Sequence, residues 1–545
     1  MKVLSLHTLG HDTGLSYWEA GRLVFSIETE RLTRRKHDPR GEIALEYFAT
    51  HFPAALAEID LVALSTEIRE TFVAVDDVEG CHRTIAAGAT HATSSCELLG
   101  RRYPCLVVLH EASHAALAYH YAGTPDRCLV FVNEGRGRLT RNSLYVCGPD
   151  RIALVDRDRL PWFCTGFGWT ALGYLFGFGD DPSAAGRLMA VGGYGRSSGA
   201  LDDRIRSVDP MIHYRGRDEQ RREVTKLVDL NGSPPPFDLM ADYISTFQQA
   251  FTDGVCEYLK NALVEHDATH LALGGGCALN LNANAAIRAR VTPHVGIGPA
   301  CNDAGQALGV AIYAHLFHLG IRPEPFTHAC NGLASPADDT RTRVAALGLK
   351  ARAYDEEWLA RILTDGAVVA YLNRRSDIGP RSLGNRSLYA NPRIPGMRRR
   401  VSEQLKQREW FRPLSPLMTR DAFEALVPGA PPSPYMLFAY DVPPMLFPEA
   451  VHVDGSARIQ TVTPSDNARV HGLVSAFQRA SGVPALINTS LNSRGRAMAY
   501  TVDDALDDFL GADVDVFVFD EVMALNPKRE ELQGAGAGDV ARRAW

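Results

Sequence analysis

The short pattern that most directly suggests chemistry is His110-Glu-Ala-Ser-His114, which begins an alanine-rich stretch. Alanine favours helix, and residues four apart lie on one helical face, so the two imidazoles could bind one metal ion. The chain has 18 histidines, and chance alone supplies roughly 0.6 such pairs in a chain of this composition. A purely structural role for both histidines is therefore an equal alternative from this pattern alone.

The same five residues satisfy the His-Glu-x-x-His pattern of zinc proteases, in which Glu111 would be the general base. However, the pattern directly follows an apolar strand rather than lying deep in a long amphipathic helix. Downstream carboxylates such as Asp126 also have no recognisable third-ligand context. A zinc protease is thus an alternative and not the prediction.

Two glycine-rich turns follow, Leu273–Asn280 and Gly298–Gly309. A glycine-rich turn that opens a helix presents backbone N–H groups to phosphate, and the missing Cβ atoms permit close approach of a ligand. The two turns together predict a nucleotide site, although each alone could be a plain turn. The residues predicted to bind the nucleotide are Gly275, Gly276 and Asn280, together with Glu134 in a third turn, Asn133–Arg138. Asp303 could add a hard oxygen ligand to the two histidines.

Charge and composition limit the classes of partner. The 545 residues carry a formal net charge of −7, which disfavours a surface built to bind nucleic acid. The N-terminus lacks the pattern of a signal peptide, and no apolar run is long enough to span a bilayer. We therefore expect a cytoplasmic protein without a membrane or nucleic-acid partner, its oligomeric state open and a homodimer one alternative. The ten cysteines form no Cys-x-x-Cys pair and are expected to be reduced.

Alternating short apolar runs and helix-compatible stretches predict a mixed α/β fold. Proline and polar residues between about Gly320 and Leu349 are typical of a connection, so a first domain over 1–350 and a second over 351–545 are expected. The predicted strands are Lys2–His7, Gly14–Trp18, Leu23–Glu28, Cys105–Leu109, Cys128–Asn133, His270–Leu273, His294–Ile297, Ala367–Leu372, Pro484–Ile487 and Val514–Phe519; Phe247–Glu265 is a predicted helix.

The order of motifs in the first half resembles that of the nodulation-protein-type O-carbamoyltransferases. The matching segments are His11–Ser16, Gly21–Val24, Glu28–His37, the His110/His114 pair, Gly186–Met189 and Gly274–Asn280. The resemblance implies an N-terminal actin-like (ASKHA) domain in which His110, His114 and Asp303 hold a divalent metal, with Fe(II) the expected ion.

The second half resembles the same family more closely, through Asp377–Ser387, Lys406–Pro413, His452–Arg458 and Asn488–Gly495. It implies a C-terminal YrdC-like α/β domain that forms carbamoyl-adenylate. Carbamoyl phosphate and ATP are both polyanions, so their site must supply fixed cations. The residues expected to bind them are Arg381, Lys406, Arg412, Arg458, Asn488 and Ser490.

The resemblance thus implies an O-carbamoyltransferase that depends on ATP, with Mg(II), and on carbamoyl phosphate. The carbamoyl group would pass from the adenylate to a hydroxyl of a small-molecule, natural-product acceptor at the N-terminal metal. Arg381, Lys406 and Arg412 are the candidate catalytic residues of the first step. His11, beside Asp12, is the candidate general base of the second; a simple turn histidine is nearly as good an interpretation.

Several positions depart from the family pattern. Glu134 and Arg138 stand where relatives have Asp and Glu, Arg187 stands at a usual Lys, and Leu491 and Arg496 replace the usual Phe and Glu. The reversed charge at Arg138 suggests a different acceptor. Two rival functions also fit the expected folds: a tRNA-modifying enzyme that transfers a threonylcarbamoyl group, and a binding protein that has kept only the fold.

Overall fold

The structure is a computed structural model that describes residues 1–135, 140–179, 181–227, 235–334 and 340–526. The chain forms two compact units. The first unit comprises residues 1–26 and 39–325, and the second comprises residues 27–38 and those from Phe326 onward. The expected boundary near residue 350 lies within the second unit, and a short segment of the N-terminal half belongs to that unit as well.

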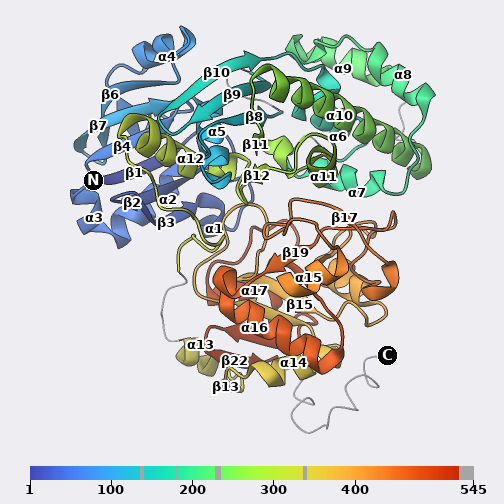
Figure 1. Cartoon of the computed structure of the whole chain (residues 1–545). Coiled ribbons are helices and arrows are strands. Elements are labelled where there is room, and N and C mark those ends of the chain that lie inside the picture. The colour runs from blue at the N-terminus through green and yellow to red at the C-terminus, as the bar shows by residue number, and fades with distance from the viewer. Residues whose placement is uncertain (136–139, 180, 228–234, 335–339, 527–545) are drawn as a thin grey trace. The chain divides into compact units, whose positions relative to one another are not determined.

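The first unit contains two sheets (Figure 1). In one sheet the strand order is β3-β2-β1-β4-β7-β6-β5, and in the other it is β10-β9-β8-β11-β12. The strands are β1 (Lys2–His7), β2 (Gly14–Glu19), β3 (Arg22–Glu28), β4 (Leu61–Ser65), β5 (Val73–Val75), β6 (His91–Leu98), β7 (Arg101–Val108), β8 (Cys128–Asn133), β9 (Asn142–Gly148), β10 (Arg151–Arg157), β11 (His270–Gly274) and β12 (Val295–Ile297).

Both sheets repeat one topology. β1 pairs antiparallel with β2 and parallel with β4, which is parallel to β7. In the same way β8 pairs antiparallel with β9 and parallel with β11, which is parallel to β12. This duplication is the arrangement that the actin-like expectation for this unit requires. Ligands of open α/β sheets bind beyond the carboxyl ends of such parallel strands.

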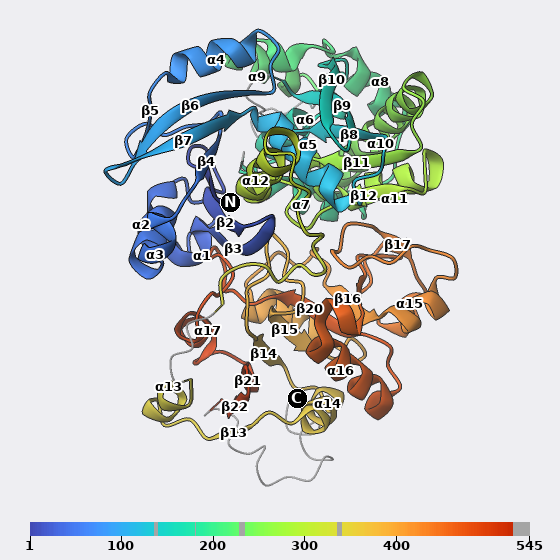
Figure 2. The same ribbon diagram turned by 60° about the vertical axis from the view of Figure 1, so that its left-hand side comes forward.

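The helices of the first unit are α2 (Gly41–His51), α3 (Pro53–Ala57), α4 (Val78–Ala86), α5 (His110–Tyr121), α6 (Gly166–Leu175), α7 (Ala184–Gly192), α8 (Gly199–Ser207), α9 (Arg217–Thr225), α10 (Phe237–Glu265), α11 (Leu281–Arg290) and α12 (Gln306–Tyr313). Figures 1 and 2 show α5 and α12 between the two sheets. α12 packs on β1, β2 and β4, α5 packs on β8, β11 and β12, and the two helices contact each other.

Gly309 sets how closely α12 approaches α5. A Cβ at this position would lie 2.2 Å from the carbonyl oxygen of Ser113. Gln306 also bonds α5, because its Nε2 donates to the carbonyl oxygen of His110 at 3.2 Å. The contact between the two helices therefore fixes the turn before α12 relative to the start of α5.

We expect Gly309→Ala to lower the free energy of unfolding by about 1–3 kcal/mol, because the overpacked contact outweighs the better helix propensity of alanine. Urea denaturation would measure the change. The matched control is Gly186→Ala in α7, where a Cβ would have no atom within 4 Å; this variant should gain up to about 1 kcal/mol. Equal effects of the two substitutions would show that the α5–α12 contact is not tight.

The second unit is built on one eight-stranded sheet with the order β13-β22-β21-β14-β15-β20-β16-β19. A smaller two-stranded sheet pairs β17 with β18. The strands are β13 (Ala351–Ala353), β14 (Val369–Leu372), β15 (Arg386–Ala390), β16 (Ser415–Thr419), β17 (Tyr440–Asp441), β18 (Ser456–Ala457), β19 (Gln460–Val462), β20 (Leu486–Ser490), β21 (Val516–Phe519) and β22 (Val522–Leu525).

Helices α14 and α16 contact each other and share one buried core with this sheet (Figure 2). The limits of α16 follow from local signals: Thr463 and Asp466 form a capping box at its start, and Gly482 ends it with a left-handed φ of 68°. The helices of this unit are α1 (Thr29–Thr33), α13 (Thr340–Ala346), α14 (Glu356–Thr364), α15 (Arg420–Leu426), α16 (Pro464–Ser481) and α17 (Val502–Phe509).

The expected α/β class is confirmed in both units. The predicted strands are all present, with Lys2–His7 and Cys128–Asn133 matching β1 and β8 residue for residue. The predicted helix Phe247–Glu265 is the C-terminal part of the longer α10. Among the described residues, no helix has both the length and the apolar character needed to cross a bilayer.

Candidate metal and anion-binding sites

The parallel strands of the first unit bring chemically active side chains together at their carboxyl ends. His110 begins α5 shortly after β7, Glu134 directly follows β8, and Asp303 follows β12. The expected stacking of His110 and His114 on one helical face is present, with the two ring centroids 4.9 Å apart. His114 and Asp303 are 189 positions apart in the chain. They meet because α5 and the turn after β12 both begin near the same strand ends.

Four side chains of this unit converge on one point: His110, His114, Glu134 and Asp303. His114 Nε2 lies 2.8 Å from Glu134 Oε1 and 3.2 Å from Asp303 Oδ1. His110 Nε2 lies 3.2 Å from Glu134 Oε2 and 3.6 Å from Asp303 Oδ1. Both imidazoles and Glu134 are almost completely buried.

These residues fit a divalent transition metal. His110 Nε2 and Glu134 Oε2 are buried and make no hydrogen bond, although they are close to each other. Polar atoms left in this way normally need a ligand. Two imidazole nitrogens and two carboxylates suit Fe(II), Mn(II) or Zn(II). An ion that prefers six ligands would have positions left for a substrate, whereas a tetrahedral zinc would not. The predicted ligands His110, His114 and Asp303 are thus brought together, and Glu134, predicted as a nucleotide contact, joins them.

The histidines and carboxylates of this cluster stabilise each other's charged forms. Burial disfavours the protonated form of His114, but Glu134 and Asp303 outweigh it and raise the pKa to about 9. Burial also opposes ionisation of Glu134, yet the two imidazoles hold the pKa of its carboxyl well below the usual range. Without a metal ion, both imidazoles are therefore protonated at neutral pH.

Metal binding should consequently release protons, because a metal ion binds only the neutral imidazole. We expect Co²⁺ added at pH 7 in weak buffer to release at least about two protons per bound ion, one from each imidazole ligand, as followed with a pH indicator. Affinity should weaken as the pH falls, since protons then compete for the same nitrogens. His114→Ala should release about one proton fewer. Binding without proton release would contradict this charge arrangement.

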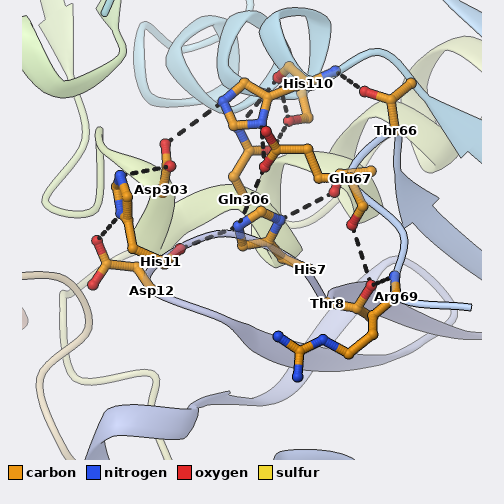
Figure 3. Close-up of polar contacts among 12 residues, drawn as sticks. His7, Thr8, His11, Asp12, Thr66, Glu67, Arg69, His110, Asp303 and Gln306 are labelled. Atoms are coloured by element: carbon orange, nitrogen blue, oxygen red, sulfur yellow. Dashed lines mark hydrogen bonds and ion pairs between the residues drawn. The ribbon is translucent and has the colours of Figure 1, made fainter. Parts of the chain in front are cut away.

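The side chain of His11 is about half exposed, and Figure 3 shows it beside Asp12 and Asp303. Its Nε2 is 3.5 Å from Asp303 Oδ2 and its Nδ1 is 3.0 Å from Asp12 Oδ2. Burial alone would lower the pKa of His11, but the carboxylates of Asp12 and Asp303 outweigh it and raise the pKa to about 9. A general base must be neutral, so the predicted role of His11 requires that positive charge on the metal offset these carboxylates.

Glu111 is not one of the four converging side chains. Its Oε1 accepts a hydrogen bond from the backbone N–H of Thr140 at 3.1 Å. In a zinc protease this glutamate would instead face the metal-bound water. The geometry therefore gives no support to the protease alternative.

The predicted nucleotide residues have packing contacts. Gly275 has a φ of 82°, and a Cβ there would lie 2.5 Å from the carbonyl oxygen of Asn133. Asn280 caps α11 by accepting from the N–H of Ala283 at 3.1 Å. Gly276 has open space on the side where a Cβ would stand. These contacts leave nucleotide binding at the turn as a prediction.

The second unit gathers cations from three loops. Arg458 carries a pKa that burial and the neighbouring Arg381, Arg408 and Arg412 lower well below the usual value. Such a group of like charges is suited to bind an anion, since guanidinium forks match phosphate and carboxylate oxygens. Arg381, Arg412 and Arg458 are the predicted members. Arg408 is not among the predicted residues, although its position between Lys406 and Arg412 is a usable signal.

Lys406 is buried among oxygen atoms at the edge of this arginine cluster. Its Nζ donates to Asn492 Oδ1 at 2.6 Å, to the Asn492 carbonyl at 2.7 Å and also to the Ser490 carbonyl. Burial and the nearby Arg408 hold its pKa well below the usual range. In this conformation Lys406 fixes the turn after β20, so its predicted catalytic role remains a prediction.

Asn488 and Ser490 lie within β20, which extends beyond the end of the predicted strand Pro484–Ile487. Asn488 Nδ2 donates to Gln460 Oε1 at 2.7 Å, and Ser490 Oγ receives a hydrogen bond from Arg408 at 3.2 Å. The strand therefore holds both side chains rigidly, with Ser490 beside the cations.

Residues 27–38 complete this unit. Glu28 Oε1 accepts from the N–H of Gly379 at 2.7 Å, and Arg31 donates to the carbonyl of the same glycine at 2.6 Å. Arg34 donates to the carbonyl of Ala497 at 2.6 Å. The segment thus holds the turn that leads into Arg381. The Glu28–His37 motif therefore supports residues of the second unit that lie far from it in the sequence.

The residues that depart from the family pattern lie in different surroundings. Arg138 lies outside the described residues. Arg187 donates to the carbonyl of Phe178 at 2.7 Å and to Asp181 at 2.8 Å, so it holds a local turn. Arg496 pairs with the buried Asp508 at 2.8 Å, and Leu491 is fully buried.

Comparison with known proteins shows what the chain is similar to. Family models described as carbamoyltransferase N-terminus and carbamoyltransferase C-terminus match residues 2–312 and 360–525. Nodulation protein U of Sinorhizobium fredii (strain NBRC 101917 / NGR234) is 28% identical, over 90% of this chain and 93% of the relative. A 3'-hydroxymethylcephem-O-carbamoyltransferase of Amycolatopsis lactamdurans is 29% identical, over 91% of this chain and 94% of the relative.

Among solved structures, full-length HypF in its phosphate- and nucleotide-bound form matches with a TM-score of 0.33 and 12% identity, over 57% of this chain and 46% of HypF. This TM-score is too low to support an inference about function.

Proposed function

Because the chain belongs to the carbamoyltransferase family, we propose that it is an ATP- and carbamoyl-phosphate-dependent O-carbamoyltransferase with a small-molecule acceptor. The observation that carries the proposal is the chemical contrast between its two units. One has a buried histidine–carboxylate cluster that suits a metal, and the other has an arginine cluster that suits polyanions. The relative named as an O-carbamoyltransferase supports a hydroxyl acceptor.

The first step is assigned to the arginine cluster of Arg381, Arg408, Arg412 and Arg458, where carbamoyl phosphate and Mg-ATP would bind. The product is carbamoyl-adenylate, which contains a single phosphate. Atom balance therefore requires that ATP loses pyrophosphate, that carbamoyl phosphate loses inorganic phosphate, and that one water is consumed. Arginine forks offset the charge that develops on these leaving groups. Ser490, held in β20 beside Arg408, can bond an oxygen of the substrate.

The second step is assigned to the first unit. His110, His114, Glu134 and Asp303 would hold the metal. When bound, it would supply a Lewis acid that could polarise a carbonyl oxygen or lower the pKa of the acceptor hydroxyl. The acceptor oxygen bonds to the carbamoyl carbon, the bond from that carbon to the phosphate oxygen breaks, and AMP leaves. His11, the exposed histidine beside Asp303, would take the hydroxyl proton.

The test of the first step is pyrophosphate release. Purified protein with ATP, Mg²⁺ and carbamoyl phosphate should release pyrophosphate, and omission of carbamoyl phosphate should abolish it. The acceptor can be sought by treating a metabolite extract with the same mixture and detecting, by mass spectrometry, a product heavier by one carbamoyl group. Failure to release pyrophosphate with any of Mg²⁺, Fe²⁺, Mn²⁺ or Zn²⁺ would overturn the proposal.

A further inference from the structure

Behind His110, on the side away from the metal ligands, lies a carboxylate that none of the chemistry above uses. Glu67 Oε2 is 3.4 Å from His110 Nδ1. The other ring nitrogen, Nε2, faces Glu134 and Asp303. The two nitrogens of an imidazole point in different directions, so Glu67 meets the ring on its outer side (Figure 3).

The strand end that carries Glu67 also holds the backbone of His110. Thr66, which follows β4, accepts a hydrogen bond from the His110 N–H through Oγ1 at 3.2 Å. Thr66 in turn donates its own N–H to the carbonyl of Val108 at 2.9 Å. Adjacent residues of one turn thus fix both the start of α5 and the position of the ring that projects from it.

The turn itself is fixed from β1. Thr8 Oγ1 donates to the Glu67 carbonyl at 3.2 Å and accepts from the N–H of Arg69 at 2.9 Å. His7, fully buried, places Nε2 3.9 Å from Glu67 Oε2 and bonds Ser65 Oγ through Nδ1 at 3.0 Å. Gly10 passes close to this carboxylate, because a Cβ there would lie 3.3 Å from Glu67 Oε2. The backbone that carries Glu67 is therefore fixed, and its carboxylate lies near the imidazoles of both His7 and His110.

We propose that Glu67 is the positioning residue for His110: its carboxylate accepts the Nδ1 proton, so that Nε2 is the nitrogen presented to the metal. The proposal rests on the proposed metal site. A carboxylate on the outer nitrogen fixes the tautomer and makes the ligating nitrogen more basic, and removal of such a partner commonly costs about 10- to 100-fold in metal affinity. Glu67 does not touch the substrate and is not a metal ligand.

The experiment is a Co²⁺ titration of the full-length, metal-free protein, followed by the visible absorption of the bound ion. Glu67→Ala should weaken Co²⁺ binding by about 10- to 100-fold, and Glu67→Gln by less, because its amide oxygen can still accept the Nδ1 proton. The absorption bands of the bound ion should also shift, because the basicity and orientation of the His110 ligand change. The matched control is Glu42→Gln, a carboxylate of the same unit that faces Arg69 at 3.4 Å, and it should bind Co²⁺ as the parent protein does.

The outcomes separate the two proposals. If the parent protein binds no Co²⁺ at all, the proposed metal site is wrong. If it binds Co²⁺ and both Glu67 variants bind it equally well with unchanged spectra, the site stands and the role of Glu67 is wrong. Thermal unfolding of the metal-free variants distinguishes a positioning effect from misfolding, because a positioning effect leaves their midpoints close to that of the parent.

Discussion

Arg412→Gln is expected to lower kcat/KM for carbamoyl-phosphate-dependent pyrophosphate release by about 10²- to 10³-fold, the usual cost of losing one fixed contact to developing negative charge. Glutamine keeps most of the length of the side chain but loses the charge and the guanidinium fork. The same variant should be as stable as the parent protein or more stable, because one of several mutually repelling cations has been removed. Pyrophosphate assays and thermal unfolding would measure the two effects.

The matched control for Arg412→Gln is Arg420→Gln in the same unit. Arg420 pairs with Glu424 at 2.9 Å, and both side chains are about half exposed. Such surface pairs contribute at most about 1 kcal/mol, so both activity and stability should change little. If Arg412→Gln retained as much activity as this control, the arginine cluster would not be the site of the first step.

The sequence predicts the fold well because its strongest signals are local. β1 and β8 are buried apolar runs bounded by turn residues, and such runs specify strands without reference to the rest of the chain. The His110/His114 pair is also local, since helical spacing alone places both rings on one face. Asp303 is suggested by its residue type in the second glycine-rich turn, and the family resemblance assigns it to the same metal site as the two histidines.

Local sequence patterns do not predict contacts between distant parts of the chain. Glu134 and Glu67 each follow a buried strand. Which turns face His110 is decided only by the pairing of strands within each sheet and by the packing of α5 and α12 between the sheets. Likewise, Glu28 reaches Gly379 across 351 residues, and no local pattern indicates that partner. Arg408 differs from these residues, because three cations in the Lys406–Arg412 segment are separated by only a few positions and that spacing is a local signal.

Asp303→Asn is expected to separate the two steps. Asparagine preserves the shape of the side chain but removes the negative charge that lies 3.2 Å from His114 Nε2 and 3.6 Å from His110 Nε2. Metal affinity should therefore fall, and carbamoylation of the acceptor should fall with it by at least about 10²-fold. Pyrophosphate release should remain near that of the parent, because the arginine cluster belongs to the other unit.

Asp253→Asn is the matched control for this separation. Asp253 is partly exposed and pairs with Arg290 at 2.7 Å in the same unit as the metal cluster, so neither step should change. Pyrophosphate, bound metal and carbamoylated product, each measured for both variants in a metabolite extract that the parent protein carbamoylates, give three independent readings. If Asp303→Asn lowered pyrophosphate release as much as carbamoylation, the two steps could not be divided between the two units, because loss of a metal ligand would then have stopped adenylate formation itself.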